Sequence, residues 1–539
     1  MDYSLAVSLG HNSSAVLINQ AGNVVAGYET ERFNQIKSSS AFPADPMYRL
    51  LRDNGLEPED VEVFVGHWFT SGNLPQESTK HCNLSILGKF KDVHSLSSDF
   101  THHDSHLESA ITFAGKEFDN CKVFVMDGFG TMGECISIYT NTPFGYKLDH
   151  RVFGYRNSLG LLYQYATDFM GMKMNNHEYK ILAYEVHIDE IPADRVSLDA
   201  DASDYARKML QRIFDKTFEK DFDPVVNVSA LLEVQTEIKS FLEAALIVAN
   251  VDLNNIHHRR VATAYLVQQI VEHVVLQLRR LYPSDNLLVV GGLFYNVKLN
   301  SLLCDTAKKF CVMPIAGDQG AALGVYQAHI GNLKWPGHVF WGQRNLHKVK
   351  GGSGIIVVDY ADDAMNYIEE ELNRVGFVNL VRGSMEFGPR ALCNTTTLAL
   401  PNQKATNTIN QVNNRTAEMP MAPVMTKQQA EQYFRDTDKV HKSLEYMILT
   451  REYSSNTLAL DMLGAAHYYP DKDIFTGRPQ ITNDPLMVSL LNNYGPLVNT
   501  SFNYHGLPIV FEEESIRSTH LAQHNHRPDL NIKTIVIRN

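Results

Sequence analysis

No run of apolar residues in this sequence is long enough to cross a bilayer. The longest stretches, such as Leu287 to Val290, fall far below the ~20 residues that a membrane-spanning helix needs. The first residues, MDYSLAVSLG, also lack a basic segment followed by a long apolar run, so we expect no signal peptide. We therefore expect a cytoplasmic protein that has no membrane partner.

Cysteine is scarce, and a surplus of positive charge is missing. The six cysteines are scattered and form no CxxC pair, which fits reduced thiols better than a disulfide scaffold or a zinc knuckle. The net charge of −13 gives no global attraction to a phosphate backbone. Tight non-specific DNA binding is disfavoured, although a local basic groove would be compatible with this charge. The cysteines are Cys82, Cys121, Cys135, Cys304, Cys311 and Cys393.

The chain also lacks internal repeats and Ser/Gly/Pro-rich tracts. With 539 residues, 44% of them hydrophobic, it should fold into two or more globular domains. Strand patterns at LAVSLG, AVLINQ, VVAGYE, CKVFVMD and ECISIYT predict β-structure, while residues 229–281 carry helical spacing. Residues 331–354, with a proline, several glycines and the basic cluster QRNLHKVKGG, predict a linker. We expect α/β domains at 1–345 and 355–539.

The first candidate site is HHDSH at residues 102–106. His102 and His106 stand four residues apart and would share one face of a helix. Asp127 and Asp318 each close a predicted strand, where α/β folds build sites. Two imidazoles and two carboxylates suit iron(II), manganese or zinc. The alternatives are a chance HxxxH in a chain with 22 histidines, and aspartates that act as helix N-caps.

Two further candidates are the pair Gly291-Gly292 and Arg390. The glycines follow an apolar strand, and their missing Cβ atoms would let a nucleotide approach the backbone. The pair lacks the spacing of a P-loop or a GxGxxG motif, so a tight turn is the alternative. Arg390 follows Gly388-Pro389, and its guanidinium would fit phosphate oxygens bidentately. A surface arginine after a turn is the alternative for that residue.

These segments, taken together and in order, resemble the O-carbamoyltransferase family that includes the nodulation-factor, cephamycin and tobramycin enzymes. The resemblance runs from Ser8 to about Val510. It rests on SLGHNSSAVL, ETERFNQIK, HHDSHLESA, VMDGFGTMGE, SLGLLYQYATDFMG, EYKILA, VGGLFYNVKLN, PIAGDQGAALG, MEFGPRAL, PMAP and LVNTSFNYHGLPIV.

The resemblance implies an α/β chain with two different parts. The N-terminal domain would have the actin/heat-shock-chaperone/sugar-kinase (ASKHA) fold, close to the threonylcarbamoyl-transferases of tRNA modification. The C-terminal domain would be YrdC-like and would take up carbamoyl phosphate. Such enzymes join the carbamoyl group to AMP as carbamoyladenylate, with loss of pyrophosphate from ATP, and then pass it to an acceptor hydroxyl.

The resemblance also assigns roles to residues of this chain. A divalent metal, with iron(II) expected and manganese, magnesium or zinc as alternatives, would bridge nucleotide phosphates. His11 would act as the base for the acceptor hydroxyl. The implied metal ligands are His102, His106, Asp127 and Asp318, and Gly291, Gly292 and Asn296 would surround the adenylate. The polar residues Lys37, Glu178 and Lys180 would line the same site, and the carbamoyl phosphate residues would be Arg390, Asn394, Arg415, Arg478, Asn499, Ser501 and Asn503.

The sequence departs from the family pattern around the donor. The usual GPRALGNRS reads GPRALCNTT, so Cys393 and Thr395 replace a glycine and an arginine. Asn413 and Met419 stand where a lysine and an arginine are usual, and His505 stands where arginine is common. Several positive charges near an anionic donor are therefore lost, which weakens the expectation for the donor site more than for the N-terminal residues.

Two alternative functions are a sugar-kinase-like phosphotransferase and a nucleotide-binding protein whose depleted donor site has lost catalysis. For the leading interpretation, the expected partners are ATP, carbamoyl phosphate and a hydroxyl-bearing acceptor. The acceptor would be a small molecule, a sugar, or a hydroxymethylated pyrimidine nucleotide, free or within DNA. The oligomeric state is left open, with a homodimer as one expectation.

Overall fold

The computed structural model describes residues 3–66, 85–95, 100–215, 228–415, 421–440, 442–469 and 472–539. Two residues of the sequence analysis, Cys82 and Met419, lie outside these ranges. The other five cysteines are buried and unpaired. Among the described helices, none combines the length and the apolar character that a membrane span requires.

The N-terminal sheet forms from the predicted hairpins. Strands β1, β2 and β3 run antiparallel, and two later strands add to β1 in parallel, giving the order β3-β2-β1-β4-β5. Alternating apolar residues explain the pairing, because both faces of β1 and β2 are buried. The strands are β1 (Tyr3–Ser8), β2 (Ser14–Asn19), β3 (Val24–Glu29), β4 (Val61–Val65) and β5 (Asp92–Ser95).

A second sheet repeats this topology. Its order is β10-β9-β6-β7-β8, in which β6, β7 and β8 form an antiparallel meander and β9 and β10 add to β6 in parallel. The amino-acid sequence itself carries no visible repeat, so the duplication lies in strand order and direction. The strands are β6 (Cys121–Met126), β7 (Glu134–Thr142), β8 (Gly145–Phe153), β9 (Asn286–Val290) and β10 (Lys309–Val312).

Two helices separate the sheets. Helix α11 (Ala321–Ile330) packs against β1 and β4, α4 (His102–Ala114) packs against β6 and β9, and the two helices pack against each other. Helix α2 (Ala44–Asp53) covers the other side of the first sheet. Two sheets of one topology with helices between them are the arrangement that the ASKHA fold implies, so the fold predicted for the N-terminal part is confirmed.

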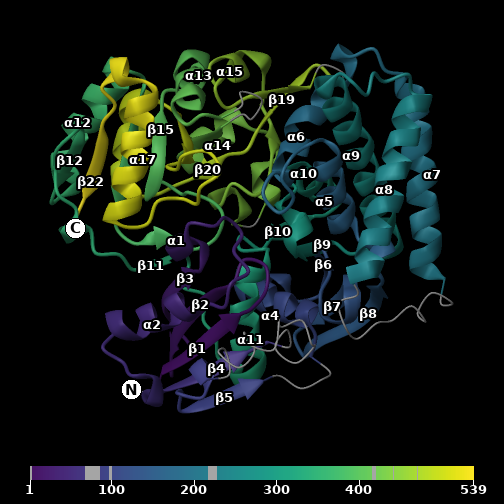
Figure 1. Cartoon of the computed structure of the whole chain (residues 1–539), viewed down its shortest axis with the longest axis horizontal. Helices are drawn as coiled ribbons and strands as arrows, with labels where there is room; N and C mark the ends of the chain where they lie inside the picture. The colour runs from purple at the N-terminus through teal and green to yellow at the C-terminus, as the bar shows by residue number, and fades with distance from the viewer. Residues whose placement is uncertain are drawn as a thin grey trace.

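The helical block predicted at 229–281 is two helices with a turn between them. Asn250 adopts φ 57° at the end of the first helix, and the Asn255 side chain caps the second by accepting the N–H groups of His257 and His258. Figure 1 shows these helices beside α7, at the edge of the second sheet. The helices of this region are α5 (Leu159–Phe169), α6 (Ile181–Tyr184), α7 (Arg195–Phe214), α8 (Val228–Val248), α9 (Ile256–Leu281) and α10 (Val297–Asp305).

The C-terminal part is also α/β, as predicted. Alternate residues of its strand β13 face opposite layers: Val378 and Leu380 pack with α12 and α16, whereas Phe377 and Val381 face the other side. The sheet runs β12 (Ile355–Val358), β22 (Thr534–Ile537), β13 (Phe377–Arg382), β15 (Thr395–Ala399), β21 (Leu497–Ser501), β16 (Ala422–Met425) and β20 (Gln480–Ile481). Its helices are α12 (Ala361–Arg374), α13 (Gln403–Val412), α14 (Lys427–Tyr433), α15 (Asn456–Leu460), α16 (Pro485–Tyr494) and α17 (Glu513–His526).

Contacts cross the predicted boundary between 345 and 355. Strand β11 (Phe340–Gly342) pairs with β14 (Met385–Glu386), and the segment before Arg390 is tied to the N-terminal part. Gly388 N–H donates to Glu29 Oε2 at 3.0 Å, and Arg32 donates to the carbonyl of Gly388 at 2.8 Å. These contacts fix one part against the other, and the boundary itself stays a prediction. The remaining elements are α1 (Glu31–Asn34) and the small sheet of β17 (Arg451–Glu452), β19 (Ile474–Gly477) and β18 (His467–Tyr469).

Candidate active site

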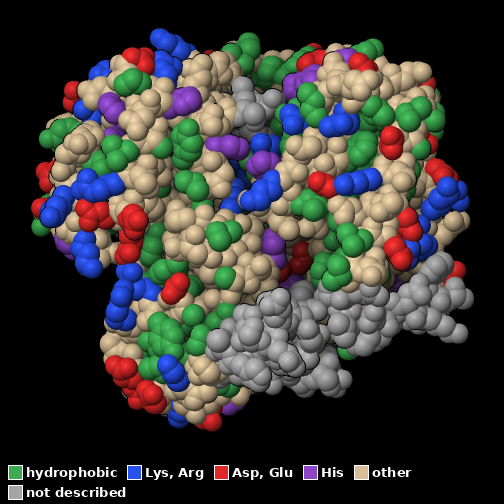
Figure 2. All heavy atoms as spheres, viewed as in Figure 1, with side chains coloured by type: hydrophobic (Ala, Val, Ile, Leu, Met, Phe, Trp, Pro, Cys, Tyr) green, Lys and Arg blue, Asp and Glu red, His purple; other side chains and the backbone are tan. Residues whose placement is uncertain are grey.

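A cavity of about 620 Å³ lies where the N-terminal strands, helices α5 and α10 and the C-terminal sheet meet. Figure 2 shows a hollow near the centre of this face, with Lys, Arg and His side chains on its walls. Most of the predicted site residues line this cavity, although they come from segments hundreds of residues apart. They are His11, Lys37, Asp127, Glu178, Gly292, Asn296, Asp318, Arg390, Arg415, Arg478, Asn499, Ser501 and Asn503. His102, His106, Lys180, Gly291 and Asn394 do not line it.

The four predicted metal ligands converge at one point. Nε2 of His102 lies 3.3 Å from Asp127 Oδ2 and 3.2 Å from Asp318 Oδ1. Nε2 of His106 lies 3.3 Å and 3.5 Å from the same two atoms, and the two Nε2 atoms are 3.1 Å apart. These five separations match the edges of a tetrahedron whose centre lies about 2 Å from each corner, the usual ligand distance of a first-row divalent metal, and all four ligand atoms lie within 4.8 Å of one another. The geometry therefore fits a metal ion.

The charges of these four side chains also favour a cation. Burial lowers the pKa of His102, but the carboxylates of Asp318 and Asp127 outweigh burial and raise it to about 10. Burial raises the pKa of Asp127, and the two imidazoles outweigh it and hold that pKa well below its usual range. The carboxylates thus lie in a buried position that demands positive charge between them. A set of nitrogen and oxygen ligands is compatible with iron(II), manganese and zinc alike.

A buried network holds the helix that carries the histidines. Thr101 caps α4 in a capping box with Asp104. Tyr139 and Arg151, from β7 and β8, donate to Asp104 Oδ1 at 2.7 and 2.8 Å. The N–H of His103 donates to Glu134 Oε1 at 2.8 Å. The second sheet thereby fixes the first turn of α4, and with it the direction of the His102 side chain.

Gly291 and Gly292 meet two different demands. Gly291 adopts φ 106°, and a Cβ there would lie 2.2 Å from the carbonyl oxygen of Met126. A Cβ at Gly292 would lie 2.8 Å from Asp127 Oδ1. Only glycine therefore fits beside β6, and Gly292 leaves the carboxylate of Asp127 open to the cavity. Asn296 is the N-cap of α10, and its amide also donates to Tyr163 at 2.8 Å.

His11 lies in the exposed turn after β1 and opens onto the cavity. Its Nδ1 pairs with the Asn12 side chain at 2.9 Å. Glu178 lies near it, and burial raises the pKa of Glu178 even though His11 and Lys37 act in the opposite direction. Burial lowers the pKa of Lys37, as do the nearby arginines. A histidine, a carboxyl group and an amine thus share one wall, while Lys180 is buried behind it.

Three arginines of the C-terminal part form a further wall, near Lys37. Arg390, Arg415 and Arg478 all line the cavity, and none of them pairs with a carboxylate in the described ranges. Arg415 donates to Thr500 Oγ1 at 2.7 Å, and Nε of Arg390 is buried without a partner. Burial lowers the pKa of Arg478 well below its usual range, and the other two guanidiniums add to the effect. An uncompensated cluster of this kind is suited to an anionic ligand.

The polar residues of β21 support these arginines. The amide of Asn499 donates to the carbonyl of Ala391 and to Gln480 Oε1, both at 2.7 Å, so it holds the segment that carries Arg390. Ser501 donates to Asn503 Oδ1 at 2.6 Å. Asn394 instead turns away from the cavity and donates to the carbonyl of Ser384 at 2.8 Å.

Three of the departures from the family pattern lie outside the cavity lining. Cys393 is buried and adopts φ 76°, a conformation that favours the glycine expected there. Thr395 accepts a hydrogen bond from Arg344, and Asn413 accepts one from Gln523 at 2.7 Å. His505 does line the cavity, where its ring stacks on that of His177 with centroids 5.8 Å apart.

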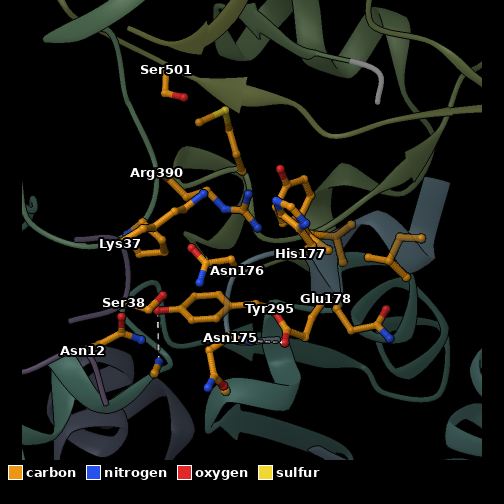
Figure 3. Close-up of a pocket in the computed structure, with 18 of the residues that line it drawn as sticks. Asn12, Lys37, Ser38, Asn175, Asn176, His177, Glu178, Tyr295, Arg390 and Ser501 are labelled. Atoms are coloured by element: carbon orange, nitrogen blue, oxygen red, sulfur yellow. Dashed lines mark hydrogen bonds between the residues drawn. The ribbon is translucent and has the colours of Figure 1, made fainter. Parts of the chain in front are cut away.

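Sequence reasoning missed Tyr295 and His177. The Tyr295 hydroxyl accepts the N–H of Gly317 and the amide of Gln319, both at 3.0 Å, on either side of Asp318. Figure 3 shows Arg390 and His177 extending toward one another above the Tyr295 ring. Both missed residues adjoin predicted ones, Asn296 and Glu178, and that adjacency was the available signal.

Comparisons with known proteins agree with this arrangement. A family model described as carbamoyltransferase N-terminus matches residues 78–326, and one described as carbamoyltransferase C-terminus matches residues 369–537. The chain is thus a transferase enzyme of the carbamoyltransferase class. More narrowly, it belongs to the O-carbamoyltransferase family, which its named relatives represent.

The relatives are distant in sequence, and some extend over nearly the whole chain. Nodulation protein NolNO of Sinorhizobium fredii is 24% identical and covers 93% of this chain and 75% of its own length. The 3'-hydroxymethylcephem-O-carbamoyltransferase of Amycolatopsis lactamdurans is 26% identical and covers 46% of this chain and 48% of its own. An uncharacterised protein of Methanocaldococcus jannaschii is 25% identical over 95% of both chains.

Solved structures show weaker likeness. The activator of 2-hydroxyisocaproyl-CoA dehydratase from Clostridium difficile, with bound ADPNP, is 13% identical with a TM-score of 0.33, over 61% of this chain and 94% of its own. Full-length HypF in a phosphate- and nucleotide-bound form is 14% identical with a TM-score of 0.28, over 61% of this chain and 55% of its own. The fold assignment above therefore rests on the strand order of the two sheets.

Proposed function

We propose that the enzyme is an ATP-dependent O-carbamoyltransferase that works through carbamoyladenylate. We call His102, His106, Asp127 and Asp318 the metal-type cluster. The observation that carries this proposal is one cavity lined by the two carboxylates of this cluster, the three arginines and His11. Activation and transfer can then take place without release of a reactive intermediate into water. A phosphotransferase on the same fold would leave the C-terminal arginine wall without a role.

The arginine wall is proposed to bind the carbamoyl donor. Carbamoyl phosphate, ATP and water would give carbamoyladenylate, phosphate and pyrophosphate. Arg390, Arg415 and Arg478 offer guanidinium donors to the phosphate oxygens, and Asn499 keeps the Arg390 segment in place. The charges lost at Thr395 and Asn413 do not face the cavity, so donor binding is proposed to survive these two departures.

The metal-type cluster is proposed to face the nucleotide. His102, His106, Asp127 and Asp318 would hold a divalent cation, with iron(II) favoured by the family resemblance. When bound, such a cation supplies Lewis acidity and neutralises charge on phosphate oxygens. Asp127 and Asp318 reach the cavity themselves, while both histidines approach from behind. Gly292 and Asn296 line the cavity next to these carboxylates and would contact the adenylate.

His11 is proposed to accept the proton of the acceptor hydroxyl during transfer. The hydroxyl oxygen would form a bond to the carbamoyl carbon as the bond from that carbon to AMP breaks. Lys37 and Glu178 lie on the same wall and would orient the groups that react. Lys180 and Asn394 do not line the cavity, so we propose that they only position neighbouring residues that do.

The acceptor is proposed to be a small hydroxylated molecule, a sugar, or a hydroxymethylated pyrimidine nucleotide. A volume of about 620 Å³ must hold the nucleotide, the donor and the acceptor, which favours a compact acceptor. A pyrimidine within DNA could reach His11 only if it left the base stack. We also propose that the enzyme is located in the cytoplasm and forms a homodimer. Its domains are proposed to span 1–345 and 355–539, the second of them YrdC-like.

The test is carbamoyl transfer from radiolabelled carbamoyl phosphate to a panel of hydroxylated acceptors, with pyrophosphate release measured in parallel. The panel would include aminoglycosides, β-lactams, sugars, macrolides and hydroxymethylated pyrimidine nucleotides. Transfer that depends on ATP supports the proposal. Phosphate transfer from ATP to an acceptor, without carbamoylation, would identify a phosphotransferase instead.

His11→Asn should separate the two half-reactions. Acceptor carbamoylation should fall by ~10²–10⁴, because a general base is lost, while a first turnover of pyrophosphate release persists. His526→Asn, which changes an exposed histidine of α17, is the matched control and should leave both activities unchanged. If both activities fall together in His11→Asn, the histidine belongs to the nucleotide site and not to the transfer step.

A further inference from the structure

A second cavity of about 680 Å³ shares no lining residue with the active site. It lies between α2, residues 343–348 and Arg538 near the C-terminus. Figure 1 shows α2, β11 and the C-terminus on one side of the molecule, where Figure 2 shows Lys and Arg side chains close together. The basic cluster QRNLHKVKGG, which the proposed reaction does not use, supplies most of one wall.

The lining is strongly cationic for a chain of net charge −13. It contains four arginines and one lysine against a single carboxylate, that of Asp53. Two of the arginines also meet carboxylates outside the lining. Arg49 pairs with Asp53 and with Glu512, and Arg538 reaches an aspartate at 3.4 Å and keeps a buried Nε without a partner.

The other cations have weaker compensation. The Arg52 side chain is 70% exposed, and its contact with Asp53 is long, at 3.4 Å. Arg344 donates to neutral oxygens, among them the carbonyls of Gly383 at 2.9 Å and Asn394 at 3.0 Å. Burial lowers the pKa of Arg344 to about 10, so it stays a cation at neutral pH. Lys348 is exposed and makes no ion pair within the described ranges.

We propose that this second cavity binds a compact phosphate-bearing anion at a site separate from the active site. Guanidinium groups match phosphate oxygens in pairs, and the volume falls within the range of small-ligand sites. The lining holds one apolar side chain, Leu346, and no Phe, Tyr or Trp, so it recognises the phosphate groups and not a stacked base.

The shape of the site selects a small anion over a nucleic-acid backbone. Three chain segments surround the cavity, whereas a duplex would need an extended basic stripe. The site also lies behind the donor wall, because Arg344 bonds the carbonyl of Asn394, four positions after Arg390. A bound anion would therefore not take part in the reaction, and it would act on the active site through the segment that joins Arg344 to Arg390.

The test uses the full chain and inorganic tripolyphosphate as the probe, with binding measured by calorimetry. Arg52→Glu combined with Lys348→Glu should weaken tripolyphosphate binding at this site about tenfold or more, because both residues are exposed and their charges reverse. Lys308→Glu combined with Lys427→Glu makes the same change in charge at exposed positions outside both cavities and should bind as the wild type does.

Arg390→Ala separates this site from the active site. Binding at the second cavity should persist in Arg390→Ala, since Arg390 lines only the first. The proposal is overturned if Arg390→Ala removes all tripolyphosphate binding, or if the Arg52→Glu/Lys348→Glu variant binds as the wild type does. It is also overturned if a DNA duplex, and not tripolyphosphate, binds in a manner that depends on Arg52 and Lys348.

Discussion

Replacing Gly324 by alanine should loosen the metal-type cluster without touching any of its four side chains. Gly324 lies in α11, directly after the turn that carries Asp318, and it faces the helix that carries His102 and His106. A Cβ at this position would lie 1.8 Å from the carbonyl oxygen and 2.6 Å from the carbonyl carbon of Ser105. These are backbone atoms, so no side-chain rotation can relieve the contact.

The size of the effect follows from that distance. Helices α4 and α11 must separate by roughly 1.5 Å to restore an ordinary contact between the new Cβ and Ser105. Even a third of this shift, passed to Asp318, exceeds the ~0.2 Å within which metal–ligand distances are held. We expect metal affinity to fall about 10–100-fold. Overpacking should also cost about 1–3 kcal/mol of unfolding free energy.

The assay is metal content by elemental analysis after dialysis against a graded chelator, together with thermal unfolding. Gly351→Ala is the matched control, because a Cβ there would meet its nearest atoms at 3.5 and 3.9 Å without positive φ. That control should keep both metal and melting temperature. Asp318→Ala is the reference for loss of a ligand, and it should lose metal while the protein stays folded.

Two results would refute this reasoning. Wild-type metal affinity in Gly324→Ala would mean that the packing of α11 on α4 does not set the geometry of the cluster. Equal metal content in the wild type and in Asp318→Ala would remove the metal assignment itself.

Three further predictions concern the cavity walls and the segment behind them. Arg390→Ala removes one of three uncompensated arginines, so carbamoyl-phosphate-dependent pyrophosphate release should fall about 100-fold or more, while the melting temperature holds or rises; normal release would exclude Arg390 from donor binding. Cys393→Gly relieves about 1 kcal/mol of left-handed backbone strain but loses a buried side chain. The free energy of unfolding, measured with denaturant, should therefore change by no more than about 1 kcal/mol. Its pyrophosphate release should be unchanged, because residue 393 does not line the cavity. Burial holds the pKa of His177 at about 4, below its unfolded value of ~6.5, so folding stability falls as pH drops from 6.5 toward 4; His177→Asn should flatten that slope in unfolding experiments, and an identical slope would contradict the cause.

Local features of this protein could be predicted from neighbouring residues. The hairpin of β1 and β2 follows from apolar strands around the turn residues HNSS, and the helical character of 229–281 follows from apolar spacing, although its division into α8 and α9 does not. The four-residue interval placed His102 and His106 on one face of α4, as helix geometry requires. The order of the family-like segments along the chain was enough to identify the family, and the two family models match the same regions of the chain.

Other features could not be predicted from any local pattern. The two sheets share strand order and direction without sharing residues, so no repeat is visible in the sequence. Nothing near Lys180 or Asn394 indicates that these side chains stay out of the cavity. The second cavity forms only when α2, residues 343–348 and the C-terminus come together.

The sequence by itself determined the local elements, the helix that carries the paired histidines and the membership of the family. Those properties depend on side-chain spacing and backbone preferences over a few residues, which neighbouring positions encode directly. Only the tertiary structure decided how closely Asp127 and Asp318 approach those histidines, that Arg390 and His11 line one cavity, and that Glu29 anchors Gly388. These contacts join residues hundreds of positions apart, and they depend on how the sheets and the helices between them pack.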